Sequence, residues 1–177
     1  MEQFLVITAM GQDRPGICDE VVRLVSQCEC NIVDSRIGGF GCEFTLIMLL
    51  SGSQSAITQV ETRLPLLAQQ HDLITLLKRT RRYEPINCDY NADFNISVED
   101  RTGLIEKFTH FLATRQIDLT ALSANTRNYD DTPPMLEIFI SSRLPDGCHI
   151  IELQEAFQAL CESLDAKGTI NFSQNNQ

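Results

Sequence analysis

The sequence contains one internal repeat, and this repeat constrains the fold more than any other feature. A shift of 87 positions places Asp13-Arg14-Pro15-Gly16-Ile17 on Asp100-Arg101-Thr102-Gly103-Leu104 without a gap. The apolar positions that follow also superpose, with the i, i+4, i+7, i+8 spacing of a helix that buries one face. They are Ile17, Val21, Leu24 and Val25 in the first copy, and Leu104, Phe108, Phe111 and Leu112 in the second.

This repeat divides the 177 residues into two domains of similar organisation. We predict a first domain at residues 1–80, a linker at 81–90 that contains Pro85, a second domain at 91–173 and a polar tail at 174–177. Domains of this size are within the ordinary range, and the apolar content of 43% is sufficient for a buried core in each.

Each copy is predicted to fold as strand, helix, strand, strand, helix, strand. In the first copy, a second helix is expected at 53–63, with Pro65 ending it, because proline cannot continue the hydrogen bonding of a helix interior. Gly38, Gly39 and Gly41 are expected to form a turn before the apolar strand at 44–50. The remaining strands of this copy are predicted at 4–7, 31–33 and 73–77.

The second copy follows the same order. Strands are predicted at 94–98, 118–123, 135–141 and 168–172, and helices at 103–114 and 149–164. The order βαββαβ is that of the ferredoxin-like arrangement. The sequence therefore predicts an α+β fold with two four-stranded antiparallel sheets, each carrying two helices on one face and none on the other.

The net charge of −10 lies mostly in residues 84–177, where acidic side chains outnumber basic ones. An acidic chain argues against independent binding to DNA, because phosphate-binding surfaces need clustered positive charge. One basic cluster exists, Lys78-Arg79-Thr80-Arg81-Arg82. It is interpreted as a solvated strand end, with direct contact to nucleic acid as the alternative, and it is also a candidate surface for an acidic partner protein.

Seven cysteines occur without a C-x-x-C motif, so neither a disulfide framework nor a zinc site is indicated. Histidines 71, 110 and 149 have no spacing to cysteines or carboxylates that is typical of catalysis. We therefore predict no enzyme activity, no catalytic or metal-binding residues and no cofactor. No apolar segment is long enough to span a membrane, so a cytoplasmic protein is expected.

The repeated loop has the chemistry of an anion site. Asp13 and Asp100 are expected to cap the helices that follow, and Pro15 fits a first helical turn. Gly16 permits close approach of a ligand, and the helix start offers backbone N–H donors to a carboxylate. Asn31 and Asp34 are expected to face the same ligand and accept from its ammonium group. The alternative is that the two aspartates only cap helices.

The segment from Ile7 to Ile17, followed by Cys30-Asn31-Ile32-Val33-Asp34-Ser35-Arg36, resembles the opening of an ACT domain, a small-molecule regulatory module with the βαββαβ fold. This resemblance implies a ligand site in the first copy at Asp13, Arg14, Pro15, Gly16, Ile17, Asn31 and Asp34. The equivalent residues of the second copy are Asp100, Gly103, Leu104 and Asp118, and the motif departs there at Thr102 and Asp118.

Two such domains with little else resemble the tandem ACT-domain repressors of the glycine cleavage operon. This resemblance implies a transcriptional regulator that binds a small amino acid, most simply glycine, and contacts a transcriptional activator protein. It also implies pairing of ACT sheets, within one chain or in a homo-oligomer. The alternative is an amino-acid-sensing regulatory subunit of a metabolic enzyme. Neither direct nucleic-acid binding nor membrane attachment is predicted.

Overall fold

The computed structural model describes residues 2–82, 90–128 and 133–174. The chain divides into two compact units, Met1–Glu84 and Pro85–Gln177, which we call unit 1 and unit 2. The predicted linker beyond Arg82, with Pro85 and Cys88, and the tail beyond Gln174 lie outside the described residues. Among the described residues, no helix combines the length and the apolar character needed to cross a membrane.

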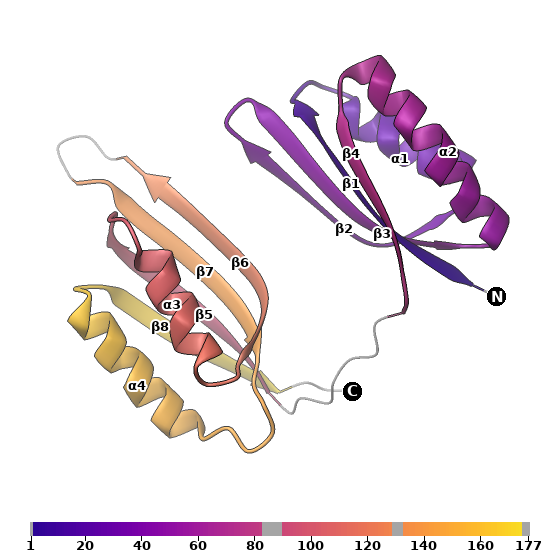
Figure 1. Cartoon of the computed structure of the whole chain (residues 1–177). Helices are drawn as coiled ribbons and strands as arrows, with labels where there is room; N and C mark the ends of the chain where they lie inside the picture. Colours follow the sequence, from indigo (N-terminus) through magenta and orange to yellow (C-terminus); the bar gives the residue numbers. More distant parts are fainter. Residues whose placement is uncertain (1, 83–89, 129–132, 175–177) are drawn as a thin grey trace. The chain divides into compact units, whose positions relative to one another are not determined.

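Unit 1 has the predicted order of strands and helices. It contains β1 (Gln3–Gln12), α1 (Ile17–Gln27), β2 (Asn31–Phe40), β3 (Glu43–Gly52), α2 (Gln54–His71) and β4 (Ile74–Thr80). The sheet has the order β2-β3-β1-β4, and all its neighbouring strands pair antiparallel. Both helices cover one face of this sheet (Figure 1).

Unit 2 repeats this architecture. It contains β5 (Tyr90–Glu99), α3 (Leu104–Ala113), β6 (Asp118–Arg127), β7 (Met135–Arg143), α4 (Ile150–Ser163) and β8 (Lys167–Gln174). Its sheet order is β6-β7-β5-β8. The two units confirm the predicted α+β fold with tandem ferredoxin-like sheets. β5 begins one residue before the predicted domain border, and β8 ends one residue beyond it.

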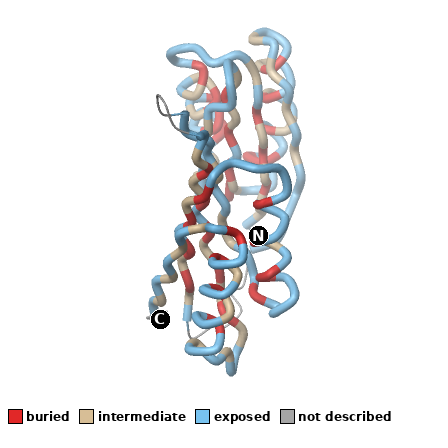
Figure 2. The backbone as a smooth tube through the Cα atoms, turned by 90° about the vertical axis from the view of Figure 1, so that its left-hand side faces the viewer, coloured by how far each residue is buried: buried red, intermediate tan, exposed pale blue. Residues whose placement is uncertain are grey.

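Buried and less buried side chains alternate along the central strands, and the buried ones form the core of each unit. In β1, Leu5, Ile7 and Ala9 are buried beneath the helices, whereas Val6 and Thr8 point to the other face. Figure 2 shows buried segments along the backbone, and in the burial patterns they recur along the central strands β1, β3, β5 and β7. In unit 2 the core is centred on four aromatic rings, Phe94, Phe108, Phe111 and Phe157.

The second helix of unit 1 continues past the proline that was expected to end it. α2 runs to His71 with Pro65 inside it, so the prediction of a helix end at Arg63 is wrong. Burial explains the difference, because Leu64 and Ala68 pack into the core on either side of the proline. Tertiary packing therefore offsets the hydrogen bond that Pro65 cannot donate. The helix ends instead at Asp72, which adopts the left-handed conformation with φ 52°.

The edge strand β2 is longer than predicted. Gly38 and Gly39 lie within it, and only Gly41, with φ 66°, occupies the turn before β3. The expectation of a three-glycine turn is therefore wrong. The pairing of β2 with β3 shifts register between Ile32 and Asp34, and β6 shows the same shift between Leu119 and Ala121. Such irregularities increase local twist and make an edge strand less regular.

Candidate functional site

The loop between β1 and α1 starts the helix without a side-chain cap. Gly16 occupies the N-cap position with φ 91°, and α1 begins at Ile17. Asp13 lies three residues earlier and donates its backbone N–H to the Cys42 carbonyl at 3.0 Å. The prediction that Asp13 caps the helix is therefore wrong, because the left-handed turn at Gly16 separates its carboxylate from the first helical turn. The N-terminal end of α1 keeps N–H donors that no side chain caps.

Arg14 anchors this loop to both helices of unit 1. Its Nη2 lies 3.0 Å from Glu20 Oε2 and 2.8 Å from His71 Nδ1, and His71 Nε2 lies 2.9 Å from the same Glu20 oxygen. Because a guanidinium can only donate, His71 accepts at Nδ1 and carries its proton on Nε2, from which it donates to Glu20. The three side chains form a closed set of hydrogen bonds that ties residues 13–16 to α1 and to the end of α2.

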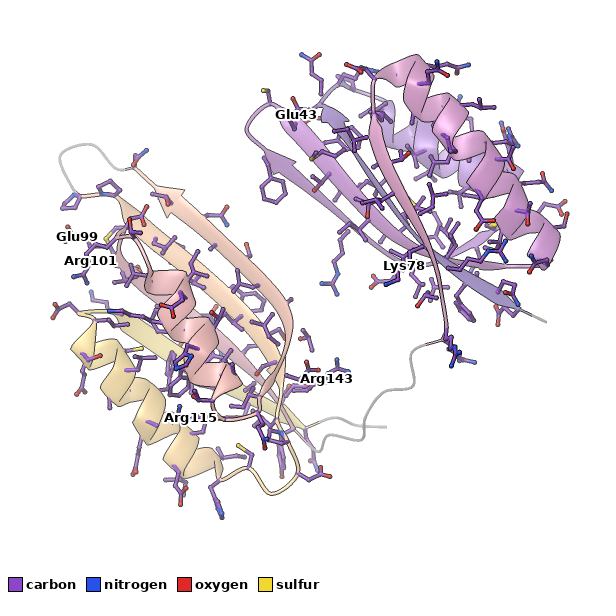
Figure 3. The ribbon with its side chains drawn as sticks, viewed as in Figure 1. Glu43, Lys78, Glu99, Arg101, Arg115 and Arg143 are labelled. Carbon is purple, nitrogen blue, oxygen red and sulfur yellow. The ribbon has the colours of Figure 1, made fainter. Side chains whose placement is uncertain are left out.

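The corresponding loop of unit 2 forms a recess. Gly103 begins α3 with φ 89° and without a side-chain cap, so the expected cap by Asp100 is also wrong. Asp100 Oδ2 instead accepts from Thr126 Oγ1 at 2.7 Å, and Arg101 Nη2 donates to the Leu164 carbonyl at 2.7 Å. Figure 3 places Arg101 beside the start of α3.

This recess has a volume of about 310 Å³. The loop from Asp100 through Leu104 lines one side, and Ala124, Thr126 and Leu136 line the other. Three of the four residues predicted in the second copy, Asp100, Gly103 and Leu104, are thus brought together. The volume is ample for a small amino acid, and the lining, which is mostly apolar, includes the Asp100 carboxylate and the Thr126 hydroxyl group.

Asn31 and Asp34 do not meet the loop of their own unit. Asn31 pairs with Ser51, which pairs with Phe4 near the start of β1. Asp13 follows the opposite end of β1, nine residues after Phe4, which corresponds to roughly 30 Å at the rise of a strand. The expectation that Asn31 faces the ligand within one unit is wrong, because α1 returns the chain to the end of the sheet where β1 begins.

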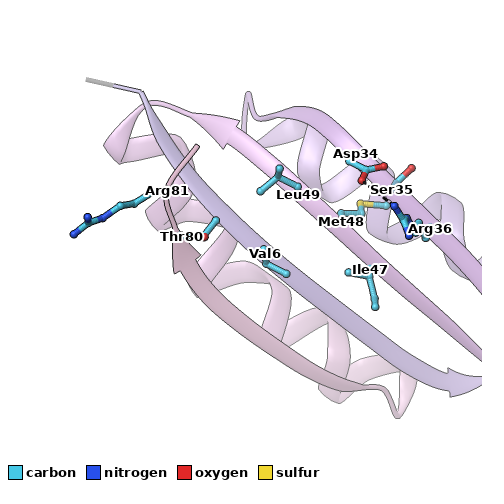
Figure 4. Close-up of a pocket in the computed structure, with 9 residues that line it drawn as sticks. All are labelled: Val6, Asp34, Ser35, Arg36, Ile47, Met48, Leu49, Thr80 and Arg81. Atoms are coloured by element: carbon cyan, nitrogen blue, oxygen red, sulfur yellow. Dashed lines mark ion pairs between the residues drawn. The ribbon is translucent and has the colours of Figure 1, made fainter. Parts of the chain in front are cut away.

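Asp34 in unit 1 and Asp118 in unit 2 each form an ion pair with a nearby arginine, at the end of the sheet that lies far from the loop. Asp34 Oδ2 lies 3.9 Å from Arg36 Nη2 on the sheet face without helices, beside a hollow shown in Figure 4. Asp118 Oδ2 lies 2.8 Å from Arg143 Nη2. Asp118 begins β6 as Asn31 begins β2, and it pairs with Arg143, which pairs with Asn91 near the start of β5, so Asp118 too is far from the loop of its own unit.

Two partners of Arg14 were missed by sequence reasoning. His71 is 57 residues from Arg14, and no motif links the two. Only the packing of α2 beside α1 brings His71 to Glu20. In unit 2, Arg101 contacts the end of α4 through a backbone carbonyl instead, so the two repeats hold the same arginine by different means.

Three thiols, those of Cys30, Cys148 and Cys161, have the character of structural cysteines. Burial raises the pKa of Cys161 to about 11, and burial also raises the pKa of Cys30 and Cys148. A thiol with a raised pKa stays protonated at neutral pH and is a poor nucleophile and metal ligand. No group of three histidine, cysteine or carboxylate side chains in the described part of the chain is arranged to hold a metal ion.

Comparison with known proteins identifies the family. The model of the ACT domain family matches residues 3–78. The glycine cleavage system transcriptional repressor of Escherichia coli strain K12 is 39% identical over 171 residues, which are 96% of this chain and 90% of that protein. The repressor of Shigella flexneri matches with the same identity and coverage.

Comparison with solved structures supports the same family and the same fold. The crystal structure of a protein proposed to be a glycine cleavage system transcriptional repressor is 54% identical, covers 99% of both chains and has a TM-score of 0.73. A protein from Galdieria sulphuraria, 18% identical, covers 99% of this chain and all of its own with a TM-score of 0.76, which shows the shared fold. The chain therefore belongs to the family of glycine cleavage system transcriptional repressors, regulators with ACT domains and a non-enzymatic role.

Proposed function

We propose that the chain represses transcription by contacting the transcriptional activator of the glycine cleavage operon, and that glycine controls this contact. The family relationship supports a regulator of this operon. The net charge of −10 favours action through a protein partner over direct operator binding, because a strongly acidic chain is repelled by DNA phosphates.

The observation that carries the glycine proposal is the uncapped helix start, which occurs in both units after an Asp-Arg-x-Gly loop. Free backbone N–H groups and the positive end of the helix dipole suit the carboxylate of an amino acid. In unit 1 the residues involved are Asp13, Arg14, Pro15, Gly16 and Ile17. In unit 2 they are Asp100, Gly103 and Leu104.

The ammonium group of glycine needs acceptors, and unit 1 of a second copy of the chain can supply them. β2 is an edge strand, so its outer backbone groups can pair with another β2 strand. Antiparallel pairing would place Asn31 of one strand beside the Phe40 end of the other. That end is close to the loop, because Asp13 donates to Cys42 in the β2–β3 turn. We place the complete site at this seam, with Asn31 and Asp34 contributed by unit 1 of a second copy of the chain.

Glycine then acts by favouring the paired arrangement that releases the activator. A ligand shifts such an equilibrium only by its difference in affinity between the two arrangements, and allosteric couplings are commonly about 1–3 kcal/mol. A weak, millimolar affinity is sufficient for a sensor of an abundant metabolite, provided that the unpaired arrangement lacks the ammonium acceptors.

Isothermal titration calorimetry with glycine, alanine and serine tests this site. We expect saturable binding that is strongest for glycine, because the repressors to which the chain is similar are named for the glycine cleavage system. Asn31→Ala is expected to weaken glycine binding about tenfold or more, as the loss of a hydrogen bond to a charged group costs about 1.5–3 kcal/mol. Ser35→Ala, on the same strand, is the matched control and should bind normally.

Two results would contradict this assignment in different ways. Normal glycine binding by both Asn31→Ala and Asp34→Ala would disprove the seam while leaving glycine as the ligand. Absence of binding by the unmodified chain, with or without the activator present, would disprove glycine control itself. The proposed contact with the activator would still stand, and it would be tested separately by measuring binding of the purified activator to the full chain.

A further inference from the structure

The two units differ most on the sheet face that carries no helices. In unit 1 this face carries exposed aliphatic side chains around Thr8: Ile47 is 49% exposed, Ile74 is 65% exposed and Leu76 is 70% exposed. Strand register places these side chains together, since Thr8 pairs with both Ile47 and Leu76, and Met10 pairs with Ile74. We call this surface the unit 1 open face. It comprises Val6, Met10, Ile47, Leu49, Ile74 and Leu76.

The fold does not require an apolar surface there, because unit 2 builds the same face from polar residues. Asn95 pairs with Phe139 and Thr169 at the positions that match Thr8, Ile47 and Leu76. Ser97 pairs with Lys167 at the positions that match Met10 and Ile74. Phe139, at 39% exposed, is a large apolar side chain of that face. The exposed aliphatic side chains of unit 1 are therefore not explained by strand formation alone.

Basic side chains border the unit 1 open face. Arg36 projects from β2, Lys78 from β4, and Arg81 follows β4 (Figures 3 and 4). A hollow of about 400 Å³ lies between Arg36 and Arg81, with Val6, Ile47 and Leu49 in its floor. Asp34 offsets part of the charge of Arg36. Glu43 lies at the other end of the face, beside the β2–β3 turn.

We propose that the unit 1 open face is the docking surface for the activator, and that the activator presents apolar side chains flanked by carboxylates. This inference rests on the proposed contact with the activator and assigns that contact to a surface. An exposed apolar patch with a charged border is typical of protein interfaces. The basic border selects an acidic partner and accelerates encounter with it.

The same border argues against a second copy of this chain as the occupant. In a two-fold symmetric contact, a patch faces itself. The border of the other copy would carry the same three cations, Arg36, Lys78 and Arg81, against two carboxylates, Asp34 and Glu43, so its net positive charge does not complement itself. An acidic partner avoids this repulsion. Pairing through the β2 edge, as proposed for glycine, leaves the open face accessible.

Binding of the purified activator to the full chain tests the docking surface. The double variant Met10→Ser/Leu76→Thr gives unit 1 the residues that unit 2 carries at matched positions, so it is designed to fold. We expect its dissociation constant for the activator to rise at least tenfold. Lys78→Glu should slow association several-fold and reduce its dependence on salt. Phe139→Ser, at the position of unit 2 that matches Ile47, is the control and should bind normally.

The outcomes separate the two proposals. If the unmodified chain fails to bind the activator, the proposed contact is wrong and the docking surface is overturned with it. If the unmodified chain binds and the double variant, with unchanged circular dichroism and unfolding midpoint, binds equally well, only the docking surface is overturned. Sedimentation velocity adds a third test: a dimer of the unmodified chain that the double variant dissociates would assign this face to a second copy and overturn the proposal.

Discussion

Replacing Phe157 by alanine is expected to destabilise unit 2 by about 3–5 kcal/mol, the range of large-to-small substitutions of a buried phenylalanine. Phe157 is 2% exposed and lies on the face of α4 that packs against the sheet. Its ring centroid is 5.1 Å from that of Phe94, 6.3 Å from Phe108 and 6.0 Å from Phe111. The substitution therefore removes contacts with β5 and α3 together and leaves a cavity that neither can fill without moving.

Urea unfolding followed by far-ultraviolet circular dichroism measures this loss. Phe139→Ala is the matched control, because Phe139 lies on the open face of the same unit and is 39% exposed. It is expected to cost less than about 1 kcal/mol, in line with the smaller apolar area that it removes from water. Equal losses in the two variants would contradict the position of Phe157 at the centre of the core.

Gly168→Ala is expected to destabilise unit 2 by about 1–3 kcal/mol, the range for overpacking a core. A Cβ at this position would lie 2.5 Å from Cys161 Sγ and 2.8 Å from two ring carbons of Phe157. Both neighbours are buried, so α4 has to move away from β8 to admit a single methyl group. Substitution by valine should cost more, because the added methyl groups enlarge the same clash.

A double-mutant cycle with Cys161→Ala isolates this contact. Removal of the sulfur should recover part of the loss caused by Gly168→Ala, giving a coupling free energy that independent sites would not show. Gly39→Ala is the control, because a Cβ there meets no atom within 4 Å. It is expected to change the free energy of unfolding by less than about 0.5 kcal/mol. Additive losses, or a neutral Gly168→Ala, would disprove the close packing of β8 against α4.

The existence and order of the helices and strands could be predicted from the sequence, because the spacing of apolar residues within a segment depends only on neighbouring residues. The helix predicted at 149–164 is observed as α4, Ile150–Ser163, with His149 and Leu164 as its caps. Where the local rule that proline ends a helix disagreed with the burial of the residues around it, the structure followed burial. Pro65 predicts a helix end, yet α2 continues for six residues beyond it to His71 because Leu64 and Ala68 pack on the sheet.

The candidate site was predicted less completely, because its residues come from different ends of the sheet. The loops at 13–17 and 100–104 are correctly identified as helix starts, but Gly16 and Gly103, not the aspartates, occupy the N-cap positions. The positive φ at Gly16 and at Gly103 is set by the direction in which each loop turns from its strand into its helix, and this direction is a property of the folded unit. The separation of Asn31 from Asp13 follows from the crossover through α1, which spacing along the chain does not reveal.

By itself, the sequence determined that the chain consists of two βαββαβ units, since the repeat and the apolar periodicity are properties of neighbouring residues. The tertiary structure alone decided which distant groups meet. It brings His71 to Arg14 and Glu20, separates Asn31 from the loop, and gathers Met10, Ile47, Ile74 and Leu76 on one face. Strand register produces that face, and register is set by packing of the opposite face against the helices rather than by any single segment.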